Sequence, residues 1–195
     1  MLILIRHPPT ALNEEGRIRG QLDPPPSPEG LLVIRKTSGQ FKGVKVEKIY
    51  SDDFKRTRAM AAAIAKVTGA KVIITPGLKT WDLGDFQGRK MDKAIEDEIA
   101  TYMKTPSKVI PGGESFEAFA KRFIDFIRPL YNLDANIVLV THGRPIMTAK
   151  AWDDADANEA PMDLSGDDLS PEPKVVEPGG IAIMGKNQPF KVIKF

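Results

Sequence analysis

The sequence predicts an α/β fold, a three-layer α/β/α sandwich around a mostly parallel central sheet. Two short apolar runs, residues 1–5 and 137–141, have the pattern of strands buried on both faces, which is typical of parallel sheets. The first run leads into Arg6 and His7, and the second leads directly into His142. Segments with helical patterns separate the strands, and this alternation favours helices on both faces of one sheet.

The other elements follow from local signals along the chain. Ser27 stands before a proline and predicts a helix start, because its hydroxyl caps the helix and proline suits the first helical position. This helix is expected over residues 31–41. A strand at residues 46–50 is followed by Asp53, which is expected to cap a helix at 55–67. Farther along we expect a strand at residues 71–74, a loop at 75–88, helices at 91–103, 114–130 and 144–151, and a closing hairpin of strands at 180–184 and 190–193.

The composition limits the chemistry. A chain of 195 residues with 42% hydrophobic residues suits one globular domain, which we assign to residues 1–195. There is no cysteine, which excludes disulfides and thiolate chemistry, and two histidines leave little for a zinc site. The opening apolar run is too short to span a membrane and lacks the charged flank of a signal peptide. We therefore expect a cytoplasmic protein that uses no metal or other cofactor.

The charges are distributed unevenly. Residues 151–178 hold nine acidic residues and one lysine, although the net charge of the whole chain is +2. This segment is also poor in apolar residues and contains several prolines, so we expect a mobile acidic loop or flap. The remainder is basic, which suits an anionic substrate such as a phosphate ester. No stripe of aromatic and basic residues indicates a nucleic-acid partner.

Four side chains are expected to meet at one edge of the sheet. His7 and His142 follow strands that we expect to be parallel, and such strands bind ligands at their carboxyl ends. Arg6 precedes His7, and Arg56 falls in the first turn of a helix, where a cation is unfavourable unless an anion binds there. Arginines clamp phosphate groups, and a histidine nitrogen can act as a nucleophile. The pattern indicates phosphoryl transfer, without the glycine-rich loop of nucleotide hydrolases.

At these residues the sequence resembles the histidine phosphatase superfamily, in its phosphoglycerate-mutase-like branch. The opening pattern of that family, a strand followed by Arg-His-Gly-x-Thr-x-x-Asn, is matched by residues 6–13. Its strand followed by Thr/Ser-His-Gly is matched by residues 140–143. Matches in the same order along the chain are found for its arginine-rich loop, its Asp-x-Pro turn, its Ser-x-x-Leu-x-Arg segment and its Gly-Gly-Glu-Ser turn, at residues 17–20, 23–27, 51–56 and 112–115.

The resemblance implies a phosphohistidine intermediate and no metal. His7 corresponds to the nucleophile of the family. The residues that correspond to its phosphate pocket are Arg6, Arg56 and His142, with Thr10, Asn13, Arg19, Gly20 and Gly143 as further substrate-binding residues.

The sequence departs from the family pattern at two positions. Pro8 replaces the glycine after the nucleophile and removes a backbone N–H beside the site. Thr80 stands where the family has its proton-donating glutamate, and a threonine hydroxyl is far too weak an acid for that role. We predict Asp82 as the replacement acid, with Asp85 and Glu114 as alternatives.

We therefore expect a metal-independent phosphatase that hydrolyses a small phosphate monoester. The expected partner is a small phosphorylated substrate, without nucleic acid or membrane. One alternative is a phosphotransferase of the phosphoglycerate mutase type. A second alternative is a weakly catalytic phosphate-binding homologue that lacks the usual acid. The sequence leaves the substrate and the oligomeric state open.

Overall fold

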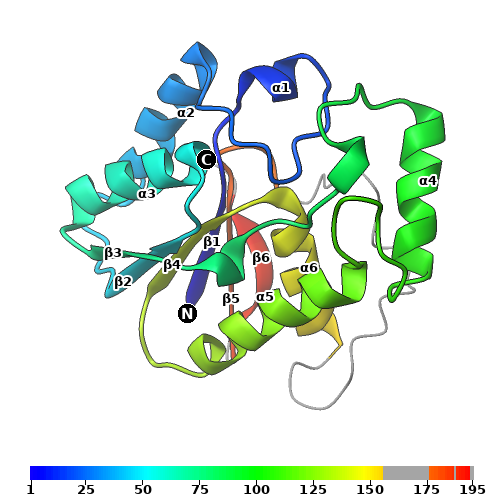
Figure 1. Cartoon of the computed structure of the whole chain (residues 1–195). Coiled ribbons are helices and arrows are strands. Elements are labelled where there is room, and N and C mark those ends of the chain that lie inside the picture. Colours follow the sequence, from blue (N-terminus) through cyan, green and yellow to red (C-terminus); the bar gives the residue numbers. More distant parts are fainter. Residues whose placement is uncertain (156–175, 187, 194–195) are drawn as a thin grey trace.

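A six-stranded sheet forms the centre of the protein in the computed structural model, which describes residues 1–155, 176–186 and 188–193 (Figure 1). The strands lie in the order β3-β2-β4-β1-β5-β6. Four neighbouring strands are parallel, whereas β5 runs antiparallel to β1 and forms the closing hairpin with β6. The predicted mostly parallel α/β fold is confirmed. The strands are β1 (Leu2–Arg6), β2 (Lys48–Ser51), β3 (Lys71–Ile74), β4 (Ile137–Thr141), β5 (Ile181–Gly185) and β6 (Gln188–Ile193).

Helices cover both faces of this sheet (Figure 1). Successive side chains of a strand point to opposite faces, and β1 shows the consequence. Leu2 and Leu4 belong to the core under α4, α5 and α6, whereas Ile3 and Ile5 belong to the core under α2 and α3. The helices are α1 (Ala11–Glu14), α2 (Pro28–Gly39), α3 (Lys55–Thr68), α4 (Lys93–Lys104), α5 (Phe116–Tyr131) and α6 (Gly143–Asp154), with short 3-10 turns at Pro76–Leu78 and Gly84–Phe86.

The helix starts differ in how well they were predicted. Ser27 caps α2 as predicted, because its hydroxyl oxygen accepts the backbone N–H of Gly30 at 3.1 Å. The predicted cap of α3 by Asp53 is wrong. Its carboxylate pairs instead with Lys79 at 3.0 Å, and the neighbouring Asp52 accepts the backbone N–H of Phe54 at 3.1 Å. Two adjacent aspartates at a helix start look alike in sequence, and only the turn of the backbone decides which one faces the helix.

The ends of the acidic segment are packed structure, which corrects the boundaries of the expected loop. Helix α6 continues to Asp154, and Val176 is buried in the same core as the residues of α6. Past it, the backbone N–H of Gly179 donates to the carbonyl oxygens of Arg6 and His7, at 3.0 and 3.2 Å. Residues 156–175 lie outside the described residues, so the predicted flap is not tested.

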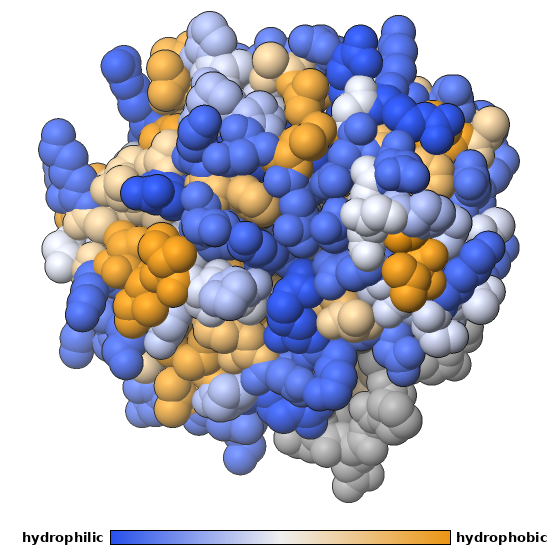
Figure 2. Space-filling model, in the orientation of Figure 1, coloured by the Kyte–Doolittle hydropathy of each residue, from blue (hydrophilic) through white to orange (hydrophobic). Residues whose placement is uncertain are grey.

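The surface seen in Figure 2 is mostly hydrophilic, with hydrophobic residues in small separate patches. In the part of the chain that the structure describes, no helix is both long enough and apolar enough to cross a membrane.

Candidate active site

A pocket of about 450 Å³ opens at the carboxyl ends of β1 and β4. These strands are parallel neighbours in a register that pairs Arg6 with Thr141, so the histidines that follow them meet at one edge, as expected. The two imidazole rings lie with their centroids 5.1 Å apart. Both rings line the pocket together with five arginines, which are Arg6, Arg17, Arg19, Arg56 and Arg144.

A backbone carbonyl fixes the imidazole of His7. Its Nδ1 lies 2.6 Å from the carbonyl oxygen of Pro8, and a carbonyl only accepts, so Nδ1 carries the hydrogen and Nε2 keeps its lone pair. Burial, the neighbouring His142 and nearby arginines lower the pKa of His7 well below its usual value. The neutral imidazole, with Nε2 unprotonated, is therefore the stable form of His7. Pro8 supplies the carbonyl that fixes this form. The backbone N–H that proline lacks is not needed to fix the tautomer.

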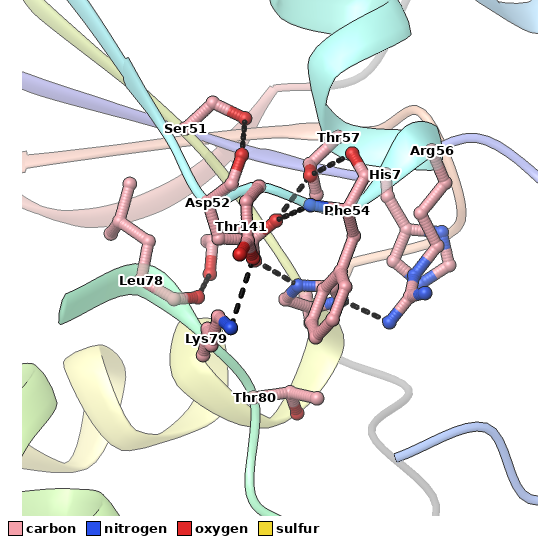
Figure 3. A network of polar contacts seen from close by, with 12 residues as sticks. His7, Ser51, Asp52, Phe54, Arg56, Thr57, Leu78, Lys79, Thr80 and Thr141 are labelled. Carbon is pink, nitrogen blue, oxygen red and sulfur yellow. Dashed lines mark hydrogen bonds and ion pairs between the residues drawn. The ribbon is translucent and has the colours of Figure 1, made fainter. Parts of the chain in front are cut away.

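His142 is held by a different partner. Its Nε2 lies 2.5 Å from Oδ2 of Asp52, which is labelled in Figure 3. Both side chains are almost completely buried. On the other side of the ring, Nδ1 lies 3.4 Å from a terminal nitrogen of Arg56. Burial and the pocket arginines lower the pKa of His142 well below its usual value.

Asp52 is not among the residues predicted from the sequence. The available signal is its position, directly after the last residue of β2, Ser51, at the same edge as both histidines. Burial raises its pKa to about 6, and hydrogen bonds from Thr57 and Phe54 act in the opposite direction.

Arg56 is fully buried and built into the wall of the pocket. Its guanidinium donates to the carbonyl oxygens of Gly20 at 3.0 Å and Leu22 at 2.5 Å, and it lies over the ring of Phe54. Its Nε has no hydrogen-bond partner in the described part of the chain. Burial lowers the pKa of Arg56 to about 10, with Asp52 and Asp23 opposing that shift.

Two further arginines act on the histidines, of which Arg6 is buried and Arg19 is half-buried. Arg6 donates to the carbonyl oxygen of Val176 at 2.8 Å. Burial, followed by repulsion from Arg6 and Arg56, lowers the pKa of Arg19 to about 10. Three guanidinium groups that line one pocket repel one another, and an anion that binds between them stabilises them. The electrostatics of the site therefore favour a dianion such as a phosphoryl group.

The predicted substrate-binding residues fall into two groups. Asn13, Arg19, Gly20 and Gly143 line the pocket, and Gly143 opens α6, so a helix N-terminus also faces the site. Thr10 is buried and does not line the pocket. Its backbone N–H and its hydroxyl both donate to Oδ1 of Asn13, at 3.1 and 2.8 Å, so it supports a pocket residue instead.

None of the three candidate acids lines the pocket, although Thr80 does. Oδ1 of Asp82 accepts the backbone N–H of Gly84 at 3.1 Å. Glu114 forms an ion pair with Arg122 at 2.9 Å and accepts the backbone N–H of Asp82. The geometry gives no support for Asp82, Asp85 or Glu114 as the proton donor.

Glu177 is the acidic residue that the structure does bring to the pocket, and among the described lining residues it is the only one. Its side chain is exposed and forms no ion pair within the described part of the chain. In the sequence it is one of nine acidic residues of the segment 151–178, and nothing there distinguishes it from the others. As for metals, the described residues contain no group of three His, Asp or Glu side chains placed to hold an ion.

Comparisons with known proteins identify the family of the chain. The family model of the histidine phosphatase superfamily (branch 1) matches residues 2–162. A probable phosphoglycerate mutase GpmB of Photorhabdus laumondii is 32% identical over 146 residues, which are 72% of this chain and 68% of that protein. A metal-independent phosphoserine phosphatase of Arabidopsis thaliana is 31% identical over 153 residues, covering 73% of this chain and 63% of the relative.

Solved structures share the whole fold. The crystal structure of a phosphoglycerate mutase from Thermus thermophilus aligns with a TM-score of 0.71 at 25% identity, over 100% of this chain and 98% of the other. The Bacillus stearothermophilus protein YhfR aligns with a TM-score of 0.76 at 23% identity, over 98% and 94%. The family match covers both strands that carry the histidines, and the chain therefore belongs to the histidine phosphatase superfamily, branch 1.

Proposed function

We propose that this protein is a metal-independent phosphatase that hydrolyses a small phosphate monoester through a phosphohistidine at His7. The observation that carries the proposal is the tautomer of His7, which the carbonyl of Pro8 fixes with Nε2 unprotonated inside a pocket of arginines. A pocket of about 450 Å³ suits a small molecule.

The reaction follows in two displacements. Nε2 of His7 attacks phosphorus while the bond from phosphorus to the ester oxygen breaks, and the leaving oxygen takes up a proton. A water molecule then attacks the phosphohistidine, loses a proton and returns His7 with release of phosphate. Arg6, Arg19 and Arg56 stabilise the charge on the phosphoryl oxygens in both steps.

The lack of an acid at Thr80 predicts a preference among substrates. An alkoxide leaves slowly unless a proton reaches it, whereas the anion of an acidic phenol leaves without one. We therefore expect aryl phosphates to react faster than simple alkyl phosphates.

Two alternatives have support of their own. The relatives named as probable phosphoglycerate mutases favour phosphoryl transfer between positions of one substrate. The threonine at position 80 favours a phosphate-binding homologue with little turnover. The relative named as a metal-independent phosphoserine phosphatase favours hydrolysis, the reaction that we propose.

One assay separates the three functions. The full chain is incubated with a panel of phosphomonoesters that includes phosphoserine, 3-phosphoglycerate and an aryl phosphate, with and without a chelator, beside His7→Ala. Phosphate release that is insensitive to the chelator and absent in His7→Ala supports the phosphatase. Interconversion of phosphoglycerates without release supports the mutase. Binding of phosphate without either reaction supports the weakly catalytic homologue.

A further inference from the structure

The contact between Asp52 and His142 is the feature that the proposed function leaves unexplained. Oδ2 of Asp52 lies 2.5 Å from Nε2 of His142. The other carboxylate oxygen accepts the backbone N–H of Phe54 at 3.1 Å and the hydroxyl of Thr57 (Figure 3). Donors from the start of α3 thus fix the carboxylate, and the carboxylate in turn fixes the imidazole.

This geometry sets the tautomer of His142. An ionised carboxylate only accepts hydrogen bonds, so Nε2 carries the hydrogen and Nδ1 keeps the lone pair. Asp52 does not line the pocket, whereas His142 and Arg56 do, and Nδ1 lies beside Arg56. The unprotonated nitrogen therefore lies on the side of the arginine clamp, the name that we give to Arg6, Arg19 and Arg56.

An unprotonated Nδ1 suits the empty pocket but not an occupied one. Without an anion, a proton on Nδ1 would add a positive charge beside buried arginines, and His142 stays neutral. A bound phosphoryl group brings two negative charges and oxygens that only accept. A lone pair on Nδ1 then faces lone pairs on oxygen, whereas a protonated Nδ1 donates a charge-assisted hydrogen bond.

We propose that Asp52 makes His142 a proton-accepting phosphate ligand. When a phosphoryl group enters, Nδ1 of His142 takes one proton from solvent and donates it in a hydrogen bond to a phosphoryl oxygen. Nε2–H stays bonded to Asp52, whose negative charge stabilises the imidazolium from behind. Asp52 is a positioning residue, because it acts on the phosphoryl group only through His142. The inference rests on the proposed phosphate pocket but does not require turnover.

The surroundings of the pair contain other charges that respond to pH. His7 lies beside His142 and has its own unprotonated nitrogen, so it is a second possible proton acceptor. The remaining charged groups that act on one or both members of the pair are Arg6, Arg19, Arg56 and Lys79, which all carry positive charge.

The substitution Asp52→Asn separates the inference from a purely structural role. The amide oxygen of asparagine still accepts the N–H of Phe54, and its NH₂ group then points to His142. A donor at that place forces the hydrogen of His142 from Nε2 to Nδ1. The variant keeps the cap of α3 and keeps a donor for the anion, but it no longer needs a proton to bind one. Asp53→Asn is the matched control, because it removes the same charge one residue away from an exposed carboxylate.

Nitrogen-15 NMR of labelled histidine measures these states directly, and the chain contains only two histidines. The full chain is prepared without a histidine tag, and His7→Gln assigns the signals. Sulfate is the probe, because it is a tetrahedral dianion that does not titrate near neutral pH. In the wild type and in Asp53→Asn we expect His142 to change from the neutral Nε2–H form to the imidazolium when sulfate binds.

In Asp52→Asn we expect the neutral Nδ1–H form with and without sulfate. The affinity for sulfate should also depend less on pH in this variant than in the wild type. For each unit by which the pH falls, the affinity should increase about tenfold less than in the wild type, a difference that corresponds to the uptake of one proton. A neutral His142 in the sulfate-saturated wild type would overturn the inference, as would the same imidazolium in Asp52→Asn. Turnover of an aryl phosphate, measured in parallel, reports separately on the proposed function. If sulfate shifts neither histidine while the aryl phosphate is still hydrolysed, the inference fails and the proposed function stands; if turnover is absent as well, both fail.

Discussion

The two histidines occupy matching positions in the sequence, yet the structure gives them opposite hydrogen positions. Each follows a buried parallel strand, and the two rings lie 5.1 Å apart. His7 donates from Nδ1 to a backbone carbonyl, which leaves the lone pair on Nε2. His142 donates from Nε2 to the carboxylate of Asp52, which leaves Nδ1 on the side of the arginines. The difference teaches that the hydrogen-bond partner of each ring, and not the position of the histidine after its strand, determines which ring nitrogen carries the hydrogen.

The largest expected effect comes from removing either ring. His7→Ala should lower kcat by at least about 10⁴-fold, the scale of losing a nucleophile. His142→Ala should lower it by about 10²- to 10³-fold, the scale of losing one charge-stabilising donor. Steady-state rates with an aryl phosphate check this order, and thermal melting confirms that both variants fold. Equal losses would mean that the two histidines do not have separate roles.

The arginine clamp is expected to matter almost as much as His142. Arg56→Lys should lower kcat/KM by about 10²- to 10³-fold, because lysine cannot reproduce the planar fork that holds two carbonyl oxygens and faces the pocket. Arg58→Lys is the matched control on the exposed side of α3 and should stay close to the wild type. A nearly normal rate in Arg56→Lys would assign that arginine to structure alone.

A smaller effect is expected from restoring the missing acid. Thr80→Glu should raise the rate with an alkyl phosphate by about tenfold or more, since a placed general acid contributes about 10²- to 10⁴-fold in a fully adapted site. The rate with an aryl phosphate should change little. Thr80→Gln is the control of equal size without the proton. Asp82→Asn should leave the ratio of the two rates unchanged, because that side chain does not line the pocket; a selective loss with alkyl phosphates would reinstate Asp82 as the acid.

A separate prediction concerns the stability of the fold at acid pH. Burial and nearby positive charge lower the pKa of both histidines in the folded protein, so the unfolded chain binds more protons below its ordinary histidine pKa of about 6.5. The free energy of unfolding should fall as the pH falls from about 6.5 to 5, by up to about 1.4 kcal/mol per pH unit for each histidine.

Asp52 acts in the opposite direction over part of this range. Burial raises its pKa from 3.8 to about 6, so the folded state binds its proton more strongly and the stability it contributes is lost as the pH rises through that interval. Thermal melting of the wild type and His7→Gln between about pH 5 and 6.5 measures the balance. The variant should lose less stability on acidification, and an unchanged slope would show that His7 is not held neutral.

The sequence was sufficient to predict the sheet and the meeting of the histidines, because buried parallel strands leave a clear apolar pattern. It was not sufficient for Asp52, whose partner is 90 residues away and is reached only through the pairing of β2 with β4. The sequence did not predict Glu177 as a pocket residue for a similar reason, because an acidic stretch does not indicate which of its carboxylates lies at the site. Asp82 follows the family loop in sequence, but the turn at Gly84, with a φ of 43°, ties its carboxylate to the backbone.

The proposed nucleophile can be tested by mapping the trapped phosphoryl group. The wild type is mixed with an aryl phosphate labelled in its phosphoryl group, quenched in alkali during turnover, and digested for mass spectrometry. We predict the label on Nε2 of His7, stable in alkali and lost in acid, still present in His142→Gln and absent in His7→Gln. Label on His142, or turnover without any labelled histidine, would contradict the assignment of the two rings.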